Sequence, residues 1–492
     1  MRKWLPLTAV SLSTFMLLVD LTIVSVAAPD LADELHSSFA ALQWTVDLYV
    51  LVLAALLMAA GSLSDRWGHR RVFLTGLVVF ALASLACGLA PNTELLIAAR
   101  GVQGLGAAAM YGTNAAILGL AYQGRDRSMA FGIWGAANGA AAAAGPILGG
   151  VLTAHVGWRS IFLVNLPVAV AAVLAARTVP AARRPDAGRL DVPGVLTFTA
   201  AVALLVYGLI RAGDKGWTEG GAVTALIAAA VAAGVFLLVE RGRPGAMLEL
   251  ALFARPAFTV AVLAAAALTA SAFANLIFVS LWAQSVLGLS AMGAGLVLAP
   301  MAVVALVVAG AGGRVLHGVP ARYSIGVGLV LVGAGNALCL LVTPESGWAV
   351  LIPGLSVTGV GVGLSTSVLA SAALGAVPGR RAGMATGASN TARQVGFAIA
   401  LPVFATVLAG AAEQVLGDRA AAEQLTGGGY ADLVGRVPAD LLRTAYADGL
   451  DRVFLIGAVV AVLGGLAVLA LLRTPAAEHE PGRAPEPLDA RA

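Results

Sequence analysis

The sequence predicts an all-α integral membrane protein, and composition and hydropathy both point to it. Hydrophobic residues make up 59% of the 492 residues, and charged residues only 11%. A soluble domain carries roughly 25% charged residues, so this chain has too few to cover a water-facing surface of its size. The net charge of +4 is spread too thinly to form a basic face for nucleic acid. These features exclude a soluble enzyme, a disordered protein and a nucleic-acid binder.

Fourteen apolar stretches follow one another along the chain, and each is long enough to span a bilayer as a helix, which takes about 20 residues. They lie near residues 5–28, 42–63, 72–90, 94–120, 128–153, 158–177, 191–210, 220–239, 257–284, 291–316, 322–343, 348–375, 383–410 and 452–472. An even number of crossings places both termini on one side of the membrane. Most of the 30 Lys and Arg residues fall in segments on the side of the N-terminus, so the positive-inside rule predicts cytoplasmic termini.

The predicted helices divide into groups of six, two and six. Residues 1–180 form the first six-helix bundle, and residues 181–250 hold two additional helices with their linkers. Residues 251–475 form the second six-helix bundle, which includes an extracellular loop at 411–451. Residues 476–492 are rich in proline and charge, which predicts a disordered cytoplasmic tail.

The loop after the second predicted helix combines glycines with one acidic and three basic residues. These are Gly61, Asp65, Arg66, Gly68, Arg70 and Arg71. The glycines permit close helix approach and a tight turn. Asp65 can receive a helix N-terminus or an arginine, so we expect this loop to act as a breakable cytoplasmic latch. The alternative is a basic anchor that only fixes topology.

Few ionisable residues fall within the predicted spans: Asp20, Asp47, Arg100 and Arg393. Each costs about 2.5–3.5 kcal/mol on insertion scales, so each is a candidate functional residue. Asp20, Asp47 and Arg100 are predicted to share one depth in the outer half of the first bundle, where a mutual cluster is the least costly arrangement. We expect them to bind and release protons, with Asp20 as the principal group. The alternatives are a static salt bridge for Arg100 and a solvated interfacial position for Asp47.

A substrate cavity is predicted from amide, aromatic and methionine side chains within the spans. The candidates are Met58, Tyr111, Asn114, Trp134, Asn138, Asn275, Phe278, Gln284, Asn336, Asn390 and Arg393. Met and aromatic residues fit adaptable apolar recognition. The alternative for each apolar member is ordinary helix packing. For Arg393, support of packing in the second bundle and a cavity role stay equally open.

No cofactor is expected. The sequence has no P-loop and no zinc-protease motif, and Cys87 and Cys339 lie in apolar runs. We therefore expect neither a metal site nor an ATP motor. The expected energy source is a proton gradient.

Three segments carry a family resemblance. The loop from Gly61 to Arg71 resembles the G-x-L-x-D-R-x-G-R-R motif of the major facilitator superfamily, and Arg100 with Gln103 and Gly104 resembles its R-x-x-Q-G motif. The fifth predicted span is similar to the G-P-x-x-G-G motif of the superfamily's antiporters, with Gly145, Pro146, Gly149 and Gly150.

Residues 18–29 and 390–396 resemble the 14-spanner drug:proton antiporters of the EmrB/QacA type. The chain departs from that family at two places. Ser25 stands where the family has Asn. No Asp follows Arg314, so no second latch is expected in the second bundle.

The resemblance implies the major facilitator fold and a secondary active transporter rather than an enzyme. It implies a proton-coupled antiporter that exports drug-like compounds or an antibiotic by alternating access. The partners are then a small-molecule substrate, protons and the lipid bilayer, with the protein as a monomer. The excess of Arg over Lys, with the abundance of Ala and Gly, indicates a bacterium with a GC-rich genome. We expect the protein in the cytoplasmic membrane of that bacterium. The alternatives are a proton-coupled importer of a small metabolite and, more remotely, a membrane enzyme or sensor.

Overall fold

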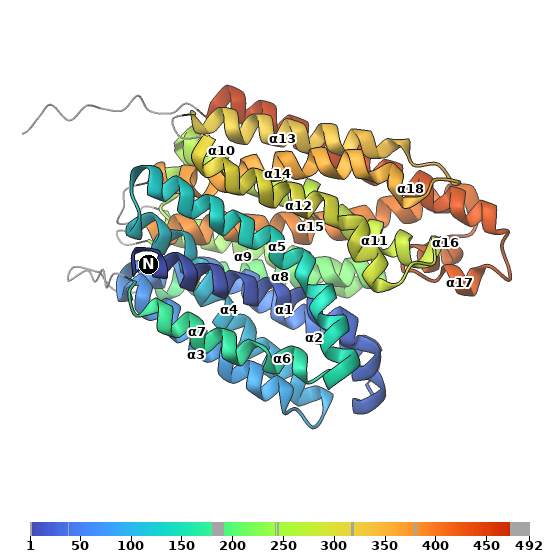
Figure 1. The fold of residues 1–492 in the computed structure, drawn as a ribbon, viewed down its shortest axis with the longest axis horizontal. Coiled ribbons are helices and arrows are strands. Elements are labelled where there is room, and N and C mark those ends of the chain that lie inside the picture. The colour runs from blue at the N-terminus through green and yellow to red at the C-terminus, as the bar shows by residue number, and fades with distance from the viewer. Residues whose placement is uncertain are drawn as a thin grey trace, which may run out of the picture.

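The computed structural model describes residues 2–37, 39–179, 191–241, 243, 246–315, 319–377 and 381–472. Within these ranges every regular element is a helix, and the long helices run roughly parallel through the length of the molecule (Figure 1). The predicted all-α fold is confirmed. The predicted tail at 476–492 and most of the first linker lie outside the described residues.

The first half of the chain forms one helical bundle. Its elements are η1 (Arg2–Trp4), α1 (Leu5–Leu35), α2 (Phe39–Trp67), α3 (His69–Gly88), α4 (Thr93–Ala121), α5 (Gly124–Val156), α6 (Ser160–Leu163) and α7 (Asn165–Ala176). Gly68 between α2 and α3 has φ of 93°, and Gly157 after α5 has φ of 97°, a region that glycine enters without strain. Asn92 caps α4 by accepting a hydrogen bond from the Leu95 amide at 2.9 Å. These turns reverse the chain between successive helices, and the closest packing in the bundle is between α3 and α4, α2 and α4, and α1 and α5.

The second half forms the other bundle. Its elements are η2 (Leu250–Ala254), α10 (Pro256–Ala272), α11 (Asn275–Leu281), the π-helical turn η3 (Trp282–Val286), α12 (Ala291–Val315), α13 (Ala321–Leu338), η4 (Cys339–Leu341), η5 (Trp348–Val350), α14 (Leu351–Gly375), α15 (Ala382–Leu416), α16 (Arg419–Thr426), α17 (Tyr430–Leu433) and α18 (Ala439–Leu471). The first span of this bundle is broken between α10 and α11, at Phe273 and Ala274.

Two further helices, α8 (Val192–Lys215) and α9 (Gly220–Glu240), form a hairpin that lies behind the bundles in the view of Figure 1. α8 packs against both α2 and α15, so it covers one of the two seams between the bundles. At the other seam α5 packs directly against α12.

Eleven of the described helices are long and apolar enough to cross a membrane. The other three predicted spans coincide with α4, with α5 and with the α6–α7 pair. α4 and α5 are long, with 29 and 33 residues, but their many Gly, Ala and amide residues lower their mean hydropathy. The α6–α7 pair forms a shorter apolar segment, Ser160–Ala176.

The segment predicted as the loop 411–451 is largely helical. α15 runs on to Leu416, α18 begins at Ala439, and α16 and α17 lie between them. Asp418 caps α16, accepting a hydrogen bond from the Ala420 amide at 2.8 Å. Leu425 of α16 and Leu433 of α17 are buried in the core of the second bundle, which explains why this polar segment is ordered.

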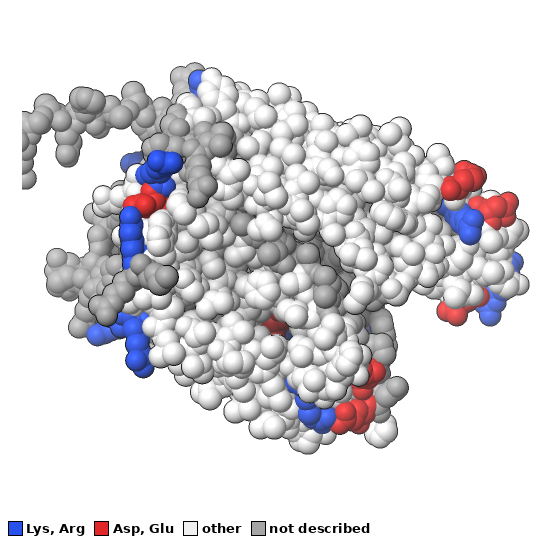
Figure 2. Space-filling view, viewed as in Figure 1, with Lys and Arg blue, Asp and Glu red and all other residues white. Residues whose placement is uncertain are grey.

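Charge is distributed along the molecule as a membrane protein requires. Lys and Arg gather at the end that holds the N-terminus, charges of both signs lie at the opposite end, and the band between is almost uncharged (Figure 2). Figure 2 also shows the surface hollowed between the two halves, toward the end away from the N-terminus.

Candidate transport site

The first bundle holds a buried acid–base network around Asp20 of α1. Arg100 of α4 donates from Nη1 to Asp20 Oδ2, and both side chains are completely buried in the bundle. The other oxygen, Oδ1, accepts from Gln103 Nε2 at 2.9 Å and from Asn165 Nδ2 at 3.0 Å. Three donors from α4 and α7 therefore converge on one carboxylate, an arrangement that suits its charged form.

Ser84 of α3 holds the two amides in place. Its hydroxyl accepts from Asn165 Nδ2 at 2.9 Å and from Gln103 Nε2 at 3.2 Å, and it donates to the Phe162 carbonyl at 3.0 Å. Gln103 Oε1 accepts from Arg100 Nη1 at 2.8 Å, which fixes the orientation of its amide. The network thus connects four helices of the first bundle: α1, α3, α4 and α7.

Arg100 makes two further contacts with α2. Its Nε donates to the Thr45 carbonyl at 2.9 Å, and its guanidinium lies 4.2 Å from the centre of the Tyr49 ring. A cation stacked on an aromatic face is stabilised without a second anion. Asp47 lies between these residues in the sequence and is only partly buried, so it is more accessible than Asp20.

The predicted latch lies where α2 meets the first turn of α15. Asp65 Oδ1 accepts from the Gly383 amide and Oδ2 from the Met384 amide, each at 2.8 Å. A carboxylate at a helix N-terminus is stabilised by the helix dipole and the unpaired amides there. Gly61 packs so closely on Gly383 that a side chain would not fit. The two bundles are joined here.

The basic residues of the loop surround this contact. Arg66 Nη1 donates to Ser62 Oγ at 2.6 Å, and Gly68 makes the turn into α3, on whose first turn Arg70 and Arg71 lie. His69, which sequence reasoning missed, places Nε2 at 3.7 Å from Asp65 Oδ1.

The predicted antiporter motif lies in the second half of α5. Gly145 packs on Thr22 of α1 with no room for a side chain, so α1 and α5 approach closely there. Gly149 is buried, whereas a side chain at Gly150 would meet open space. Pro146 lies within the helix, and its side chain lies outside the described part.

Several predicted cavity residues form a layer in the half of the molecule nearer the N-terminus. Met58, Tyr111, Asn114, Trp134 and Asn390 are all buried. Trp134 Nε1 and Asn114 Nδ2 each donate to the Thr14 hydroxyl at 2.7 Å. Asn138 donates to the Trp134 carbonyl at 2.7 Å.

Asn390 joins this layer from the other bundle. Its Nδ2 donates to the Tyr111 carbonyl at 2.8 Å, which links α15 to α4. The layer is therefore a second contact between the bundles, beyond the latch, and its side chains are packed together rather than facing an open space.

The other predicted cavity residues lie apart from that layer. Asn275 donates to Asn336 Oδ1 at 2.8 Å, and both are buried inside the second bundle. Gln284 is exposed on η3, and Arg393 is partly buried on α15. Phe278 is buried, and its carbonyl accepts from Tyr446 at 3.1 Å.

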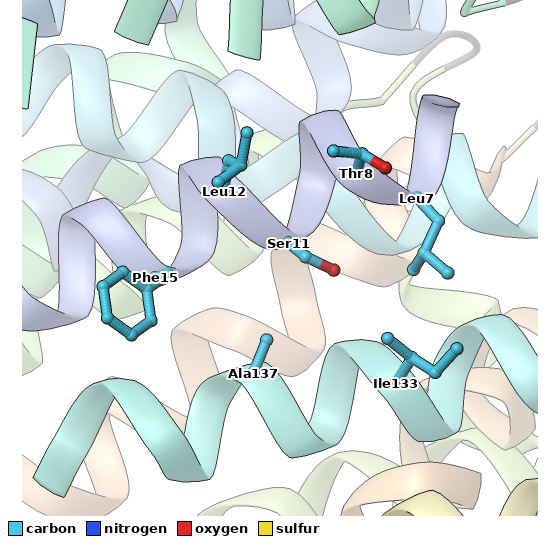
Figure 3. A pocket seen from close by; sticks show the side chains of 7 residues that line it. All are labelled: Leu7, Thr8, Ser11, Leu12, Phe15, Ile133 and Ala137. Carbon is cyan, nitrogen blue, oxygen red and sulfur yellow. The ribbon is translucent and has the colours of Figure 1, made fainter. Parts of the chain in front are cut away.

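A shallow groove of about 320 Å³ runs between α1 and α5 (Figure 3). Its lining is mostly apolar: Leu7, Thr8, Ser11, Leu12, Phe15, Ile133 and Ala137. None of the predicted cavity residues is among them.

Sequence reasoning missed Ser84 and Asn165 and gave Gln103 no role of its own. The available signal was weak, because each is a single polar residue in an apolar stretch.

The structure has two packed helical bundles, and one of them holds a buried acid–base network. The bundles are joined at one end and separated by a hollow at the other. These features define a polytopic membrane transporter. The chain belongs to the Major Facilitator Superfamily, because the model of that family matches residues 10–401.

Known proteins resemble the chain over most of its length. The Multidrug resistance protein Stp of Mycobacterium tuberculosis (strain CDC 1551 / Oshkosh) is 35% identical over 82% of this chain and 76% of its own. The Tetracenomycin C resistance and export protein of Streptomyces glaucescens is 31% identical over 99% of this chain and 95% of its own. A solved structure of the proton:xylose symporter XylE has a TM-score of 0.63 at 12% identity, covers 96% of each chain, and shows the fold alone.

Proposed function

We propose that this protein is a proton-coupled antiporter that exports drug-like organic compounds or an antibiotic across the cytoplasmic membrane of a bacterium. The observation that carries the proposal is Asp20, a carboxylate buried within the membrane-spanning part and held by Arg100. An ionisable pair at this depth is costly to keep, so its presence argues for a role in coupling. The names of the two actinobacterial relatives, which cover most of this chain, support export as the direction.

The topology belongs to the same proposal. The eleven apolar helices, together with α4, α5 and the α6–α7 pair, make fourteen spans. Lys and Arg gather at the end that holds the N-terminus (Figure 2), which supports cytoplasmic termini. With that orientation the latch closes the cytoplasmic side while the hollow opens outward. The structure then represents an outward-facing conformation of a monomer.

Protonation of Asp20 is the coupling step in this mechanism. The ionised carboxylate binds Arg100, Gln103 and Asn165 within the first bundle. A proton on Asp20 removes the charge that Arg100 compensates, so the pair loses its attraction and the bundle can rearrange. One proton entering at about 100 mV releases about 2.3 kcal/mol, which drives the substrate outward.

The substrate meets the layer that contains Tyr111, Trp134 and Asn390. In the outward-facing conformation this layer is closed, and separation of Asn390 from Tyr111 would open it to the cytoplasm. Its side chains are aromatic or neutral amides, with Met58 beside them. Such a surface accepts varied apolar shapes and offers no cation for an anionic substrate.

The proposal is tested by expressing the protein in a host that lacks its own drug pumps. Inhibitory concentrations are measured for dyes, quaternary ammonium compounds and actinomycete antibiotics, and substrate-dependent proton release is measured in inverted membrane vesicles. We expect raised tolerance and proton release together. Unchanged tolerance, combined with uptake of a sugar or organic acid, would overturn export in favour of import.

A further inference from the structure

The hairpin formed by α8, α9 and the turn between them is internally rigid. Arg211 donates from Nε and Nη2 to the two carboxylate oxygens of Glu219, each at 2.9 Å, and from Nη1 to the Tyr207 hydroxyl at 3.0 Å. Glu219 also caps α9 by accepting from the Ala222 amide at 2.7 Å. These bonds lower the pKa of Glu219 to about 2. The two helices are therefore tied to each other at the turn.

The turn of the hairpin is attached to the second bundle. Trp217 Nε1 donates to the Thr406 hydroxyl of α15 at 2.6 Å. Close by, α8 meets α15 at Gly213, where a Cβ atom would lie 3.4 Å from the Cβ of Pro402. This hydrogen bond and the close helix contact hold the turn against α15.

The opposite end of the hairpin is attached to the second bundle through the segment that connects α9 to η2. Asp191, which caps α8, accepts from the Met247 amide at 3.1 Å and pairs with Arg243 at 3.4 Å. Arg381, next to the start of α15, donates to the Ala246 carbonyl at 3.3 Å. Both ends of the hairpin are thus held to α15 or to its immediate neighbours.

The contact with the first bundle is of another kind. Tyr207 of α8 stacks on Trp44 of α2, with ring centres 6.0 Å apart, and Val202 and Val206 pack on Ala54 and Ala55 of α2. Apolar surfaces of this kind exchange neighbours for lipid chains at little cost, because lipid is as apolar as they are.

Arg66 of the latch is the charged group of α2 near the hairpin. Arg381, next to the start of α15, repels it, whereas Asp65, Asp191 and Glu240 attract it. These interactions act while the latch is closed and Arg66 lies at this position.

We propose that the hairpin moves with the second bundle, and that α2 slides along α8 as the transporter changes conformation. α8 then keeps the α2–α15 seam covered while the two bundles move relative to each other. α2 and α15 also pack directly on each other, as α5 and α12 do at the other seam, which lies on the opposite side of the molecule (Figure 1). This inference rests on the proposed alternating-access function and gives the two additional helices a role in it.

Cross-linking of cysteine pairs tests the proposal in the full chain. Cys87 and Cys339 are buried and free, and both are first replaced by alanine. The pair Gly213→Cys/Pro402→Cys links the hairpin to the second bundle, and the 3.4 Å separation of the Cβ atoms suits a disulfide. The pair Trp44→Cys/Tyr207→Cys links it to the first bundle through a short bis-methanethiosulfonate, which forms disulfides that a reductant cleaves. Gly208→Cys/Leu226→Cys, within the hairpin, is the matched control.

We expect the control pair and the link to the second bundle to leave export unchanged. The link to the first bundle should abolish export, and a reductant should restore it. Each single-cysteine variant is treated with the same reagent as a control. Substrate binding by the cross-linked protein is measured to confirm that it is folded. Loss of export on linking Gly213→Cys to Pro402→Cys, or full export with Trp44→Cys linked to Tyr207→Cys, would overturn the proposal.

Distances between spin labels provide a readout that needs no known substrate. One label is placed on the turn of the hairpin and a second on either bundle, and the distances are measured before and after acidification. The hairpin should keep its distance to the second bundle and change its distance to the first. The reverse pattern overturns this inference alone, whereas no change between the bundles themselves overturns alternating access and this inference with it.

Discussion

The two bundles carry buried polar residues at corresponding positions along their helices. In the first bundle these positions include a charged residue, and in the second they are neutral. Ser84 and Asn336 lie equally far into α3 and α13, which begin at His69 and Ala321. In the first bundle Ser84 supports the ion pair of Asp20, and in the second Asn336 bonds only neutral groups, Asn275 and the Ser271 carbonyl.

The same relation holds for α4 and α14. Arg100 and Thr358 lie equally far from the first residues of these helices, Thr93 and Leu351. Both side chains are buried, but one is a cation with an anionic partner and the other is a hydroxyl. Neutral groups are much less costly to bury than ions. The comparison therefore separates a half that buries an ion pair from a half whose side chains at the corresponding positions are neutral.

The largest expected effect comes from removing the charge on which the comparison depends. Asp20→Asn should reduce substrate-dependent proton release to the level of vesicles without the protein, because an amide cannot take up and release a proton. The matched control in the neutral half is Asn336→Ala, which should retain proton-coupled export. Full export against a gradient by the Asp20→Asn protein would remove Asp20 from the mechanism.

Arg100→Ala tests the cost of the charged arrangement. It leaves the Asp20 carboxylate buried without its cation, which typically destabilises by about 3–5 kcal/mol. Thr358→Ala, at the corresponding place in the second bundle, removes a hydroxyl that has no hydrogen-bond partner among the described residues and should cost far less. Thermal unfolding in detergent measures both. Equal losses would mean that the two places are energetically alike.

Asn165→Ala and Asn275→Ala compare the supporting amides of the two bundles. Each change removes a buried hydrogen-bond partner, and each should cost about 1–3 kcal/mol of stability. Of these two amides, Asn165 contacts Asp20 and Asn275 does not. The loss of Asn165 alone should therefore alter the pH profile of exchange. Asn165→Gln, which keeps the amide, should recover part of the wild-type profile. An unaltered profile for Asn165→Ala would make its role purely structural.

The smallest expected effect concerns the latch, which joins the bundles. Asp65→Asn keeps the shape of the side chain but removes its charge from the N-terminus of α15, an interaction typically of about 0.3–1 kcal/mol. Thiol labelling of a cysteine at Asn390 should become faster, because the cytoplasmic side opens more often. Arg125→Gln, at an exposed position at the start of α5 and outside the latch, is the control. Unchanged labelling and transport would leave the loop with a topological role.

The sequence by itself determined the all-helical membrane fold and the small set of ionisable residues within its apolar stretches. These features depend on local hydropathy and on the cost of burying charge, both of which are properties of the chain. Similar depth along helices that rise 1.5 Å per residue predicts a cluster of Asp20, Asp47 and Arg100. The structure pairs Asp20 with Arg100 inside the bundle and leaves Asp47 only partly buried.

Only the tertiary structure decided which side chains complete the site. Ser84 and Asn165 come from helices whose facing sides depend on packing, so spacing along the chain could not assign them to Asp20. For the same reason Asn275 and Asn336, predicted to line a cavity, lie bonded to each other inside the second bundle. The position of α8 against both α2 and α15 was equally beyond the sequence, because every apolar helix can pack on many neighbours and only the assembled fold selects among them.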